Sequence, residues 1–135
     1  MHLTFLEKLV LGVSGVTAVG IGGMITFAPH AFYAGYGIML GDDPNLLSEL
    51  RAPGAALATL GLLMLLGVWR STLAQLAVAS TLIVYLAFPA GRFIGLAADG
   101  MPSPGILAAL LLEIAIAGAC LFAFRKRLLR KGPAA

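Results

Sequence analysis

The sequence predicts an all-α membrane protein, a bundle of four transmembrane helices in a single domain over residues 1–135. The first observation is composition: 60% of the residues are hydrophobic and 11% are charged, whereas soluble domains carry about 25% charged residues. The second is that the chain contains four apolar runs of about 20 residues, the length that an α-helix needs to cross the hydrocarbon core. The runs predict helices at about 6–28, 44–70, 73–97 and 104–127.

The first helix, at 6–28, runs up to Pro29. It is longer than the apolar core of a secretory signal peptide and continues directly into an aromatic segment, so we expect it to stay in the protein as a span. The segment that follows is rich in glycine and does not suit a span. Its rings, among them Tyr33 and Tyr36, favour the headgroup layer, which predicts an interfacial aromatic segment between the first two helices.

The helices that start at 44 and 104 share one pattern, in which a polar capping residue precedes proline. Asp43 and Ser103 can accept hydrogen bonds from free backbone N–H groups, and proline at the first helical position has no N–H to lose. The third helix contains Pro89, which frees the carbonyl of Tyr85 and predicts a kink or a local polar contact there. The fourth helix ends in a basic run that Gly132-Pro133 terminates.

Small residues recur along each helix at spacings that let two helices approach closely, as packing in lipid requires. We read them as packing residues and not as chemistry. The residues expected at helix contacts are Gly12, Gly15, Gly54, Ala58, Gly61, Ala77, Ser80, Ala115 and Ala119.

The cations predict the orientation of the bundle. With four spans, seven of the nine lysines and arginines lie at one face, and the positive-inside rule makes that face cytoplasmic. These cations are Lys8, Arg70, Arg125, Lys126, Arg127, Arg130 and Lys131. Both termini are then cytoplasmic, and the opposite face receives Asp42, Asp43 and Asp99.

Glu49, Arg51, Arg92 and Glu113 are charged residues inside or near the ends of apolar stretches, all towards the outer side of the membrane. A charge near the bilayer centre costs roughly 2.5–3.5 kcal/mol on insertion scales, so such residues normally pair or line a polar cavity. The four sum to zero charge, as a buried network needs. Glu49 and Arg51 point to different flanks of one helix, so their partners must come from other helices. We expect a direct contact between Glu113 and one of the two arginines.

Two interpretations of these charges are open. In the first, they form a structural lock that fixes helix register through interhelical salt bridges. In the second, they surround a polar cavity open to the outside, with Glu113 at its floor and Arg51 and Arg92 as anion-binding walls. Tyr85, seven residues before Arg92, shares its wall, and the aromatic segment forms a lid. The possible wall and lid residues are His30, Tyr33, Tyr36, Tyr85 and Asp99.

The sequence does not indicate other chemistry. His2 and His30 lie on opposite sides of the membrane in this topology, so no metal site is expected, and Cys120 as the only cysteine excludes an internal disulfide. There is no phosphate-binding glycine loop, nucleophile elbow or nucleic-acid motif, and no cofactor is expected. The expected partners are membrane lipids, together with copies of the chain or a larger membrane complex.

The polar residues of the helices resemble those of a known family. The pattern consists of Ser48-Glu49-Leu50-Arg51-Ala52 with Gly54, then Gly91-Arg92, then Asp99-Gly100 before Pro102-Ser103-Pro104, and finally Glu113. Along nearly the whole chain it resembles the small bacterial four-helix membrane proteins of domain-of-unknown-function family 4345. The resemblance implies a multi-pass protein of the bacterial inner membrane and implies no activity. Pro53 departs from the pattern, since the resemblance leads us to expect a bulkier or aromatic residue there.

The function expected first is that of a non-enzymatic accessory subunit, which packs with copies of itself or in a larger complex and whose charges form the lock. The alternative is binding or transport of a small ligand or lipid in an outward-facing cavity floored by Glu113. An enzyme comes third, because the reactive groups would have to come from a cofactor or metal supplied from outside.

Overall fold

The computed structural model describes residues 1–130, which form four long helices and two short ones. The elements are α1 (Phe5–Phe27), α2 (Pro29–Ala34), α3 (Pro44–Trp69), the 3₁₀ turn η1 (Ser71–Leu73), α4 (Ala74–Asp99) and α5 (Pro104–Leu129). The predicted all-helical architecture is confirmed, and each long helix begins and ends within about two residues of its expected bounds. Each is long and apolar enough to cross a membrane, so the chain is a multi-pass membrane protein.

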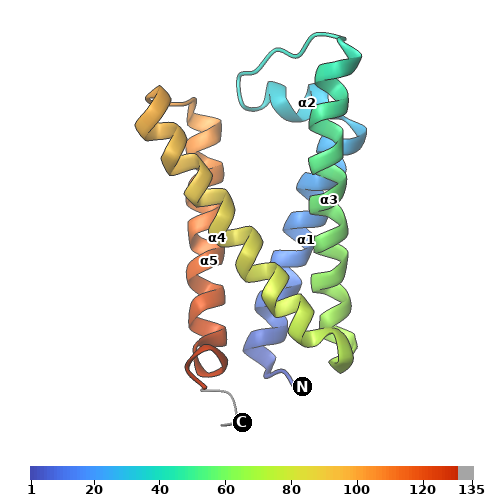
Figure 1. Cartoon of the computed structure of the whole chain (residues 1–135), viewed down its shortest axis with the longest axis vertical. Coiled ribbons are helices and arrows are strands. Elements are labelled where there is room, and N and C mark those ends of the chain that lie inside the picture. The colour runs from blue at the N-terminus through green and yellow to red at the C-terminus, as the bar shows by residue number, and fades with distance from the viewer. Residues whose placement is uncertain (131–135) are drawn as a thin grey trace.

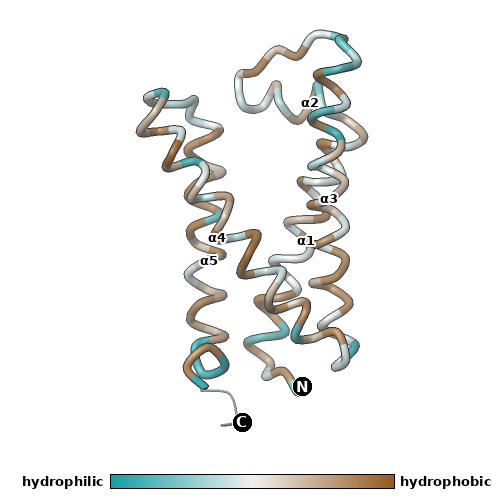
Figure 2. The backbone as a smooth tube through the Cα atoms, in the orientation of Figure 1, coloured by the Kyte–Doolittle hydropathy of each residue, from teal (hydrophilic) through white to brown (hydrophobic). Residues whose placement is uncertain are grey.

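The start of α1 and the end of α5 lie at the same end of the molecule, and α2 lies at the opposite end (Figure 1). Hydrophilic residues gather mainly near the two ends of the long helices, while the middle of each helix is mostly apolar (Figure 2). This arrangement is the one that a bilayer requires of a spanning bundle. Lys131 and Gly132-Pro133, expected to complete the basic run and its stop, lie outside the described residues.

Side-chain caps begin three of the long helices. Asp43 and Ser103 each accept a hydrogen bond from a backbone N–H in the first turn of the helix that follows, as expected. α1 starts with a capping box that was not expected: the Thr4 hydroxyl accepts from the Glu7 N–H at 3.2 Å, and Glu7 Oε2 accepts from the Thr4 N–H at 2.7 Å. α4 continues without interruption through Pro89.

α1 and α3 pack backbone against backbone. A Cβ atom on Gly22 would lie 2.5 Å from both the backbone nitrogen of Ala58 and the backbone oxygen of Gly54. A Cβ atom on Gly61 would lie 2.7 Å from the backbone nitrogen of Val19. No side chain fits at these distances, so glycine is what allows the two helices to touch. Gly54, Ala58 and Gly61 were expected at helix contacts, whereas Gly22 was not.

Three of the residues expected at helix contacts do not lie at such contacts. A Cβ atom on Gly12 would meet nothing within 4 Å, and Ala115 and Ala119 are exposed on α5. α5 instead buries Cys120 and Phe124, both 0% exposed, against the other helices. The spacing of small residues shows which of them share a face of a helix, but the neighbouring helices decide which face is buried.

α4 crosses the bundle diagonally (Figure 1). Near its start it packs on α3, where Ala77 lies against Gly67, and towards its other end it lies beside α5. The fully buried residues Leu11, Met64 and Phe124 lie in the half of the bundle nearest the termini, where the helices converge. In the other half, α1 and α3 separate from α4 and α5, which leaves room for the site described below.

A bidentate ion pair ties α1 to α5 at the end that holds the start of the chain. Arg127 Nε and Nη2 donate to Glu7 Oε1 and Oε2 at 2.6 and 2.9 Å, and Nη2 also donates to the carbonyl of His2. Glu7 is only 4% exposed, and its hydrogen bonds to Arg127 and Thr4 compensate for the burial of its charge. Sequence analysis did not identify this pair.

Gly22→Ala should destabilise the protein, because the new methyl group would lie 2.5 Å from backbone atoms of α3. Overpacking of this kind typically costs about 1–3 kcal/mol, so the midpoint of thermal unfolding in detergent should fall. Gly12→Ala is the matched control on the same helix, where the methyl group meets open space and alanine has the higher helix propensity. Equal midpoints for the two variants would contradict the close contact of α1 and α3.

Candidate functional site

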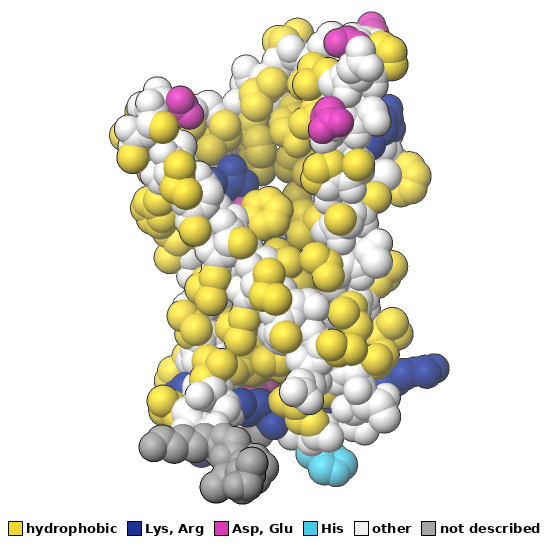
Figure 3. Space-filling view, in the orientation of Figure 1, with side chains coloured by type: hydrophobic (Ala, Val, Ile, Leu, Met, Phe, Trp, Pro, Cys, Tyr) yellow, Lys and Arg dark blue, Asp and Glu magenta, His cyan; other side chains and the backbone are white. Residues whose placement is uncertain are grey.

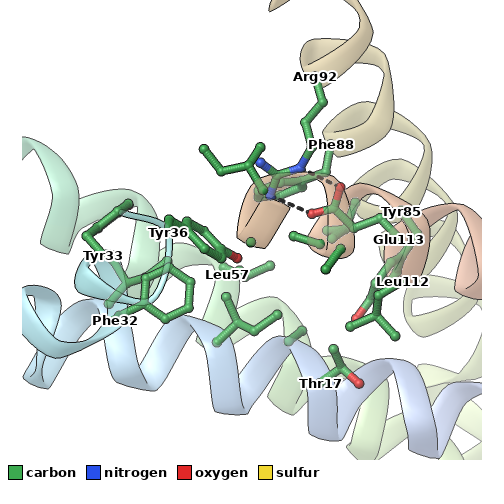
Figure 4. A pocket seen from close by; sticks show the side chains of 18 of the residues that line it. Thr17, Phe32, Tyr33, Tyr36, Leu57, Tyr85, Phe88, Arg92, Leu112 and Glu113 are labelled. Carbon is green, nitrogen blue, oxygen red and sulfur yellow. Dashed lines mark hydrogen bonds and ion pairs between the residues drawn. The ribbon is translucent and has the colours of Figure 1, made fainter. Parts of the chain in front are cut away.

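A cavity of about 520 Å³ lies between the two halves of the bundle, on the side away from the termini. A hollow is visible there between the two arms of the molecule (Figure 3), and the side chains that line it are shown in Figure 4. Residues from α1, α2, α3, α4 and α5 all contribute, and most of them are apolar. On the α1 and α3 side the lining includes Thr17, Ala18, Ile21, Ile25 and Leu57.

Arg92 and Glu113 form a bidentate ion pair at one edge of the cavity (Figure 4). Arg92 Nε donates to Glu113 Oε2 and Arg92 Nη2 to Glu113 Oε1, both at 2.8 Å, and the side chains are 23% and 10% exposed. Two parallel N–H···O bonds between a guanidinium and a carboxylate are among the strongest side-chain contacts. The pair joins α4 to α5, and it is the direct contact expected between Glu113 and an arginine.

The other charges of the expected four-residue network lie apart from this pair. Arg51 Nη1 donates to the carbonyl of Thr26 at 2.5 Å. Thr26 belongs to the last turn of α1, which has no basic residue of its own, so Arg51 supplies the positive charge that favours a helix C-terminus. Glu49 and Asp99 are exposed, and neither takes part in an ion pair within residues 1–130. The structure thus brings together two of the four charges.

Aromatic residues of α2 and the segment after it form another wall of the cavity. Phe32, Tyr33 and Tyr36 make a cluster of edge-to-face contacts with ring centroids 5.0 to 6.3 Å apart. Burial raises the pKa of Tyr36, an effect that the nearby positive charge of Arg92 partly opposes, so the Tyr36 hydroxyl is protonated at neutral pH. Burial raises the pKa of Tyr33 as well. Both tyrosines therefore present uncharged hydroxyl groups.

Tyr85 and His30 have different surroundings. Tyr85 lines the cavity, as expected for a residue on the face of Arg92, but its hydroxyl donates to the Ser14 carbonyl at 2.6 Å and so ties α4 to α1. His30 is not part of the cavity lining. Its Nε2 lies 3.1 Å from Asp42 Oδ1 and 3.1 Å from the carbonyl oxygen of Gly41.

The segment after α2 and the start of α5 close over the end of the cavity that lies away from the start of α1. The Ser103 hydroxyl donates to the carbonyl of Tyr36 at 2.7 Å. A Cβ atom on Gly105 would lie 2.6 Å from the carbonyl oxygen of Gly35, so the backbones touch there. Tyr36 and Ile38 both line the cavity beneath this contact. We call residues 29–38 the cover of the cavity.

Sequence reasoning missed several lining residues that helical periodicity could have found. Phe88 lies one turn before Arg92 and three residues after Tyr85, and all three face the cavity. Thr17, Ile21 and Ile25 repeat every four residues along α1 and form a continuous strip of the opposite wall.

The polar groups of the site are suited to binding. The Arg92–Glu113 pair offers a guanidinium whose charge is already compensated, and Tyr36 adds a hydroxyl, while the remaining lining is mainly hydrocarbon. Apolar cavities with a few converging polar groups are typical of sites for small molecules. Within residues 1–130 no group of three or more histidine, cysteine or acidic side chains could hold a metal ion.

Comparison with known proteins identifies the family and no function. The model of the family described as domain of unknown function DUF4345 matches residues 6–124. No curated protein and no solved structure matches the chain. The match extends from the first turn of α1 into the last third of α5 and includes the whole cavity. The chain therefore belongs to the DUF4345 family.

Proposed function

We propose that this protein binds a small amphipathic molecule within the membrane, in the cavity lined by α1, α2, α3, α4 and α5. The observation that carries the proposal is the cavity itself, about 520 Å³ of mostly apolar space that ends at an ion pair. This volume lies within the range of about 300–1,000 Å³ that is usual for ligand sites. The proposed role is binding or carriage without catalysis.

The depth of the polar groups supports a ligand that lies partly among lipid chains. Glu113 is about 14 Å along α5 from Pro104, and Arg92 is about 10 Å along α4 from Asp99, at 1.5 Å per residue. A molecule with its polar head at the Arg92–Glu113 pair would extend its apolar part along Ile21 and Ile25.

The second candidate is a non-enzymatic accessory subunit in which the Arg92–Glu113 pair acts only as a lock between α4 and α5. The bidentate geometry supports this candidate, because both carboxylate oxygens are satisfied without any ligand. A lock alone does not require the space beside the pair, and for this reason we favour binding.

We infer further that the protein lies in the bacterial inner membrane with both ends of the described chain in the cytoplasm. The end of the bundle that holds the start of α1 and the end of α5 also carries Lys8, Arg70 and the basic residues 125–127. The opposite end carries Asp42, Asp43 and Asp99. This asymmetry agrees with the positive-inside rule.

Ala109→Trp should abolish binding, because Ala109 lines the cavity and an indole ring would fill it. Ala115→Trp is the matched control on the same helix, at an exposed position outside the lining. The measurement is native mass spectrometry of protein released from membranes, in which the wild type and Ala115→Trp should retain a small-molecule adduct and Ala109→Trp should not. An adduct that all three retain equally, or that none of them shows, would contradict a site in this cavity.

Arg92→Ala should lower the midpoint of thermal unfolding, since it leaves the buried Glu113 carboxylate without its partner. Breaking a buried pair typically costs about 3–5 kcal/mol. The double variant Arg92→Ala with Glu113→Ala should regain part of that loss, because no unpaired charge remains. Unfolding of all four proteins gives the coupling, and strictly additive losses would show that the pair does not stabilise the bundle.

Cysteine labelling tests the orientation in a Cys120→Ser background. Met101→Cys, in the connection between α4 and α5, should react with a membrane-impermeant maleimide on intact spheroplasts. Ser71→Cys, between α3 and α4, should react only after the membrane is opened. The reverse pattern would place both ends of the described chain outside the cytoplasm and refute the inferred orientation.

A further inference from the structure

We propose that the cavity selects an uncharged amphiphile with a single hydrocarbon chain, whose head group accepts hydrogen bonds from Arg92 and Tyr36, and that Glu113 excludes anionic lipids by masking the charge of Arg92. The proposal rests on the proposed function, that the cavity binds an amphipathic molecule, and adds the chemical class of the ligand. Long-chain esters, ketones and ethers belong to this class.

The first argument is charge. Arg92 and Glu113 are the charged residues among those that line the cavity, and each is the partner of the other through two hydrogen bonds of 2.8 Å. A ligand carboxylate or phosphate would lose its hydration, and the Arg92 guanidinium would not compensate for that cost because its charge is already paired with Glu113. The Glu113 carboxylate would also repel the anion. A ligand ammonium group would meet a carboxylate whose charge Arg92 already compensates, and the Arg92 guanidinium would repel it. Ions of either sign are therefore disfavoured relative to an uncharged head group.

The second argument is the number of hydrogen-bond donors. A guanidinium has five N–H groups, and the contact with Glu113 uses two of them. The Arg92 side chain is 23% exposed and lies at the cavity edge, so its remaining donors can reach a ligand. The Tyr36 side chain extends into the same space from the cover of the cavity, and its hydroxyl lies near Arg92 (Figure 4). Both residues offer donors, so the matching ligand atom is a hydrogen-bond acceptor such as an oxygen, and the charge argument above favours one that is uncharged.

The third argument is size. With roughly 30 Å³ for each water-sized group, a cavity of about 520 Å³ holds on the order of fifteen to twenty non-hydrogen atoms. That corresponds to one medium-length chain with a small head group and is too little for a phospholipid with two chains. The aliphatic strip of Ile21, Ile25 and Leu57 suits such a chain. The cover of the cavity, residues 29–38, lies over the end of the cavity that is away from the start of α1. The hollow in Figure 3 is on the flank of the bundle, which faces lipid, so a ligand can enter from the lipid.

Three probes of equal chain length test the selection: methyl dodecanoate, dodecanoate and dodecylamine. Their binding to protein in nanodiscs of uncharged lipid is measured by native mass spectrometry, at a pH where the acid and the amine are ionised. Ala109→Trp, in which the indole ring fills the cavity, is the blocked reference: the probe signal that it gives comes from partition into lipid and is subtracted from that of the other proteins. The ester should bind the wild type about tenfold more tightly than either ion. Dodecanoate or dodecylamine binding as tightly as the ester would overturn the proposed selection while leaving the proposed binding function intact.

Two variants test the role of the named side chains. Glu113→Gln keeps a hydrogen-bond partner for Arg92 but removes the negative charge, so dodecanoate should bind this variant at least as tightly as the ester. Tyr36→Phe removes one hydrogen-bond donor, so it should weaken ester binding several-fold with little change for the two ions. Because Tyr36 lies outside the membrane spans, this variant still tests the selection if Glu113→Gln does not fold. An unchanged order of affinities in both variants would refute the assigned roles. If none of the probes binds the wild type more than the blocked reference, the proposed function fails together with this inference.

Discussion

The direct contact between α1 and α3, where Gly22 meets the backbone of Gly54 and Ala58, determines where the other long helices can lie. Two helices that touch through glycine form a narrow unit with little side-chain volume between them. α4 packs on this unit at Gly67 and then crosses towards α5, so the second pair of helices diverges from the first. The cavity occupies the space that this divergence opens, and the cover, residues 29–38, lies over the end of it that is away from the start of α1.

Two bidentate ion pairs hold α5 in place, and they differ in what surrounds them. Glu7–Arg127 lies at the end of the bundle near the termini, where polar groups are close to water and headgroups. Arg92–Glu113 lies deeper along its helices, where a charge is costly and apolar residues of similar volume often serve packing equally well. The proposed ligand contact would give the polar groups of a pair at this depth, beside open space, a role besides packing.

The long helices could be predicted from the length of the apolar runs and from the capping residues, because both depend only on residues that are close together in the sequence. The contact between Arg92 and Glu113 was also within reach, since consecutive antiparallel helices bring residues of similar depth together. The rotation of each helix about its own axis was not: Gly12 and Gly22 are alike in sequence, yet only Gly22 touches α3. For the same reason Arg51 could not be assigned to the end of α1 in advance.

Four of the residues that carry the family resemblance, together with Ser103, make contacts between elements of the bundle. Arg51 donates to the last turn of α1, Gly54 lies against Ile25, and Arg92 is paired with Glu113. Ser103 both caps α5 and donates to the carbonyl of Tyr36, which fixes the cover of the cavity. Polar side chains used in this way set the spacing of the helices, because each bond spans two elements that lipid alone would not hold in register. These members of the pattern thus hold together the helices that surround the cavity, whereas Glu49 and Asp99 are exposed.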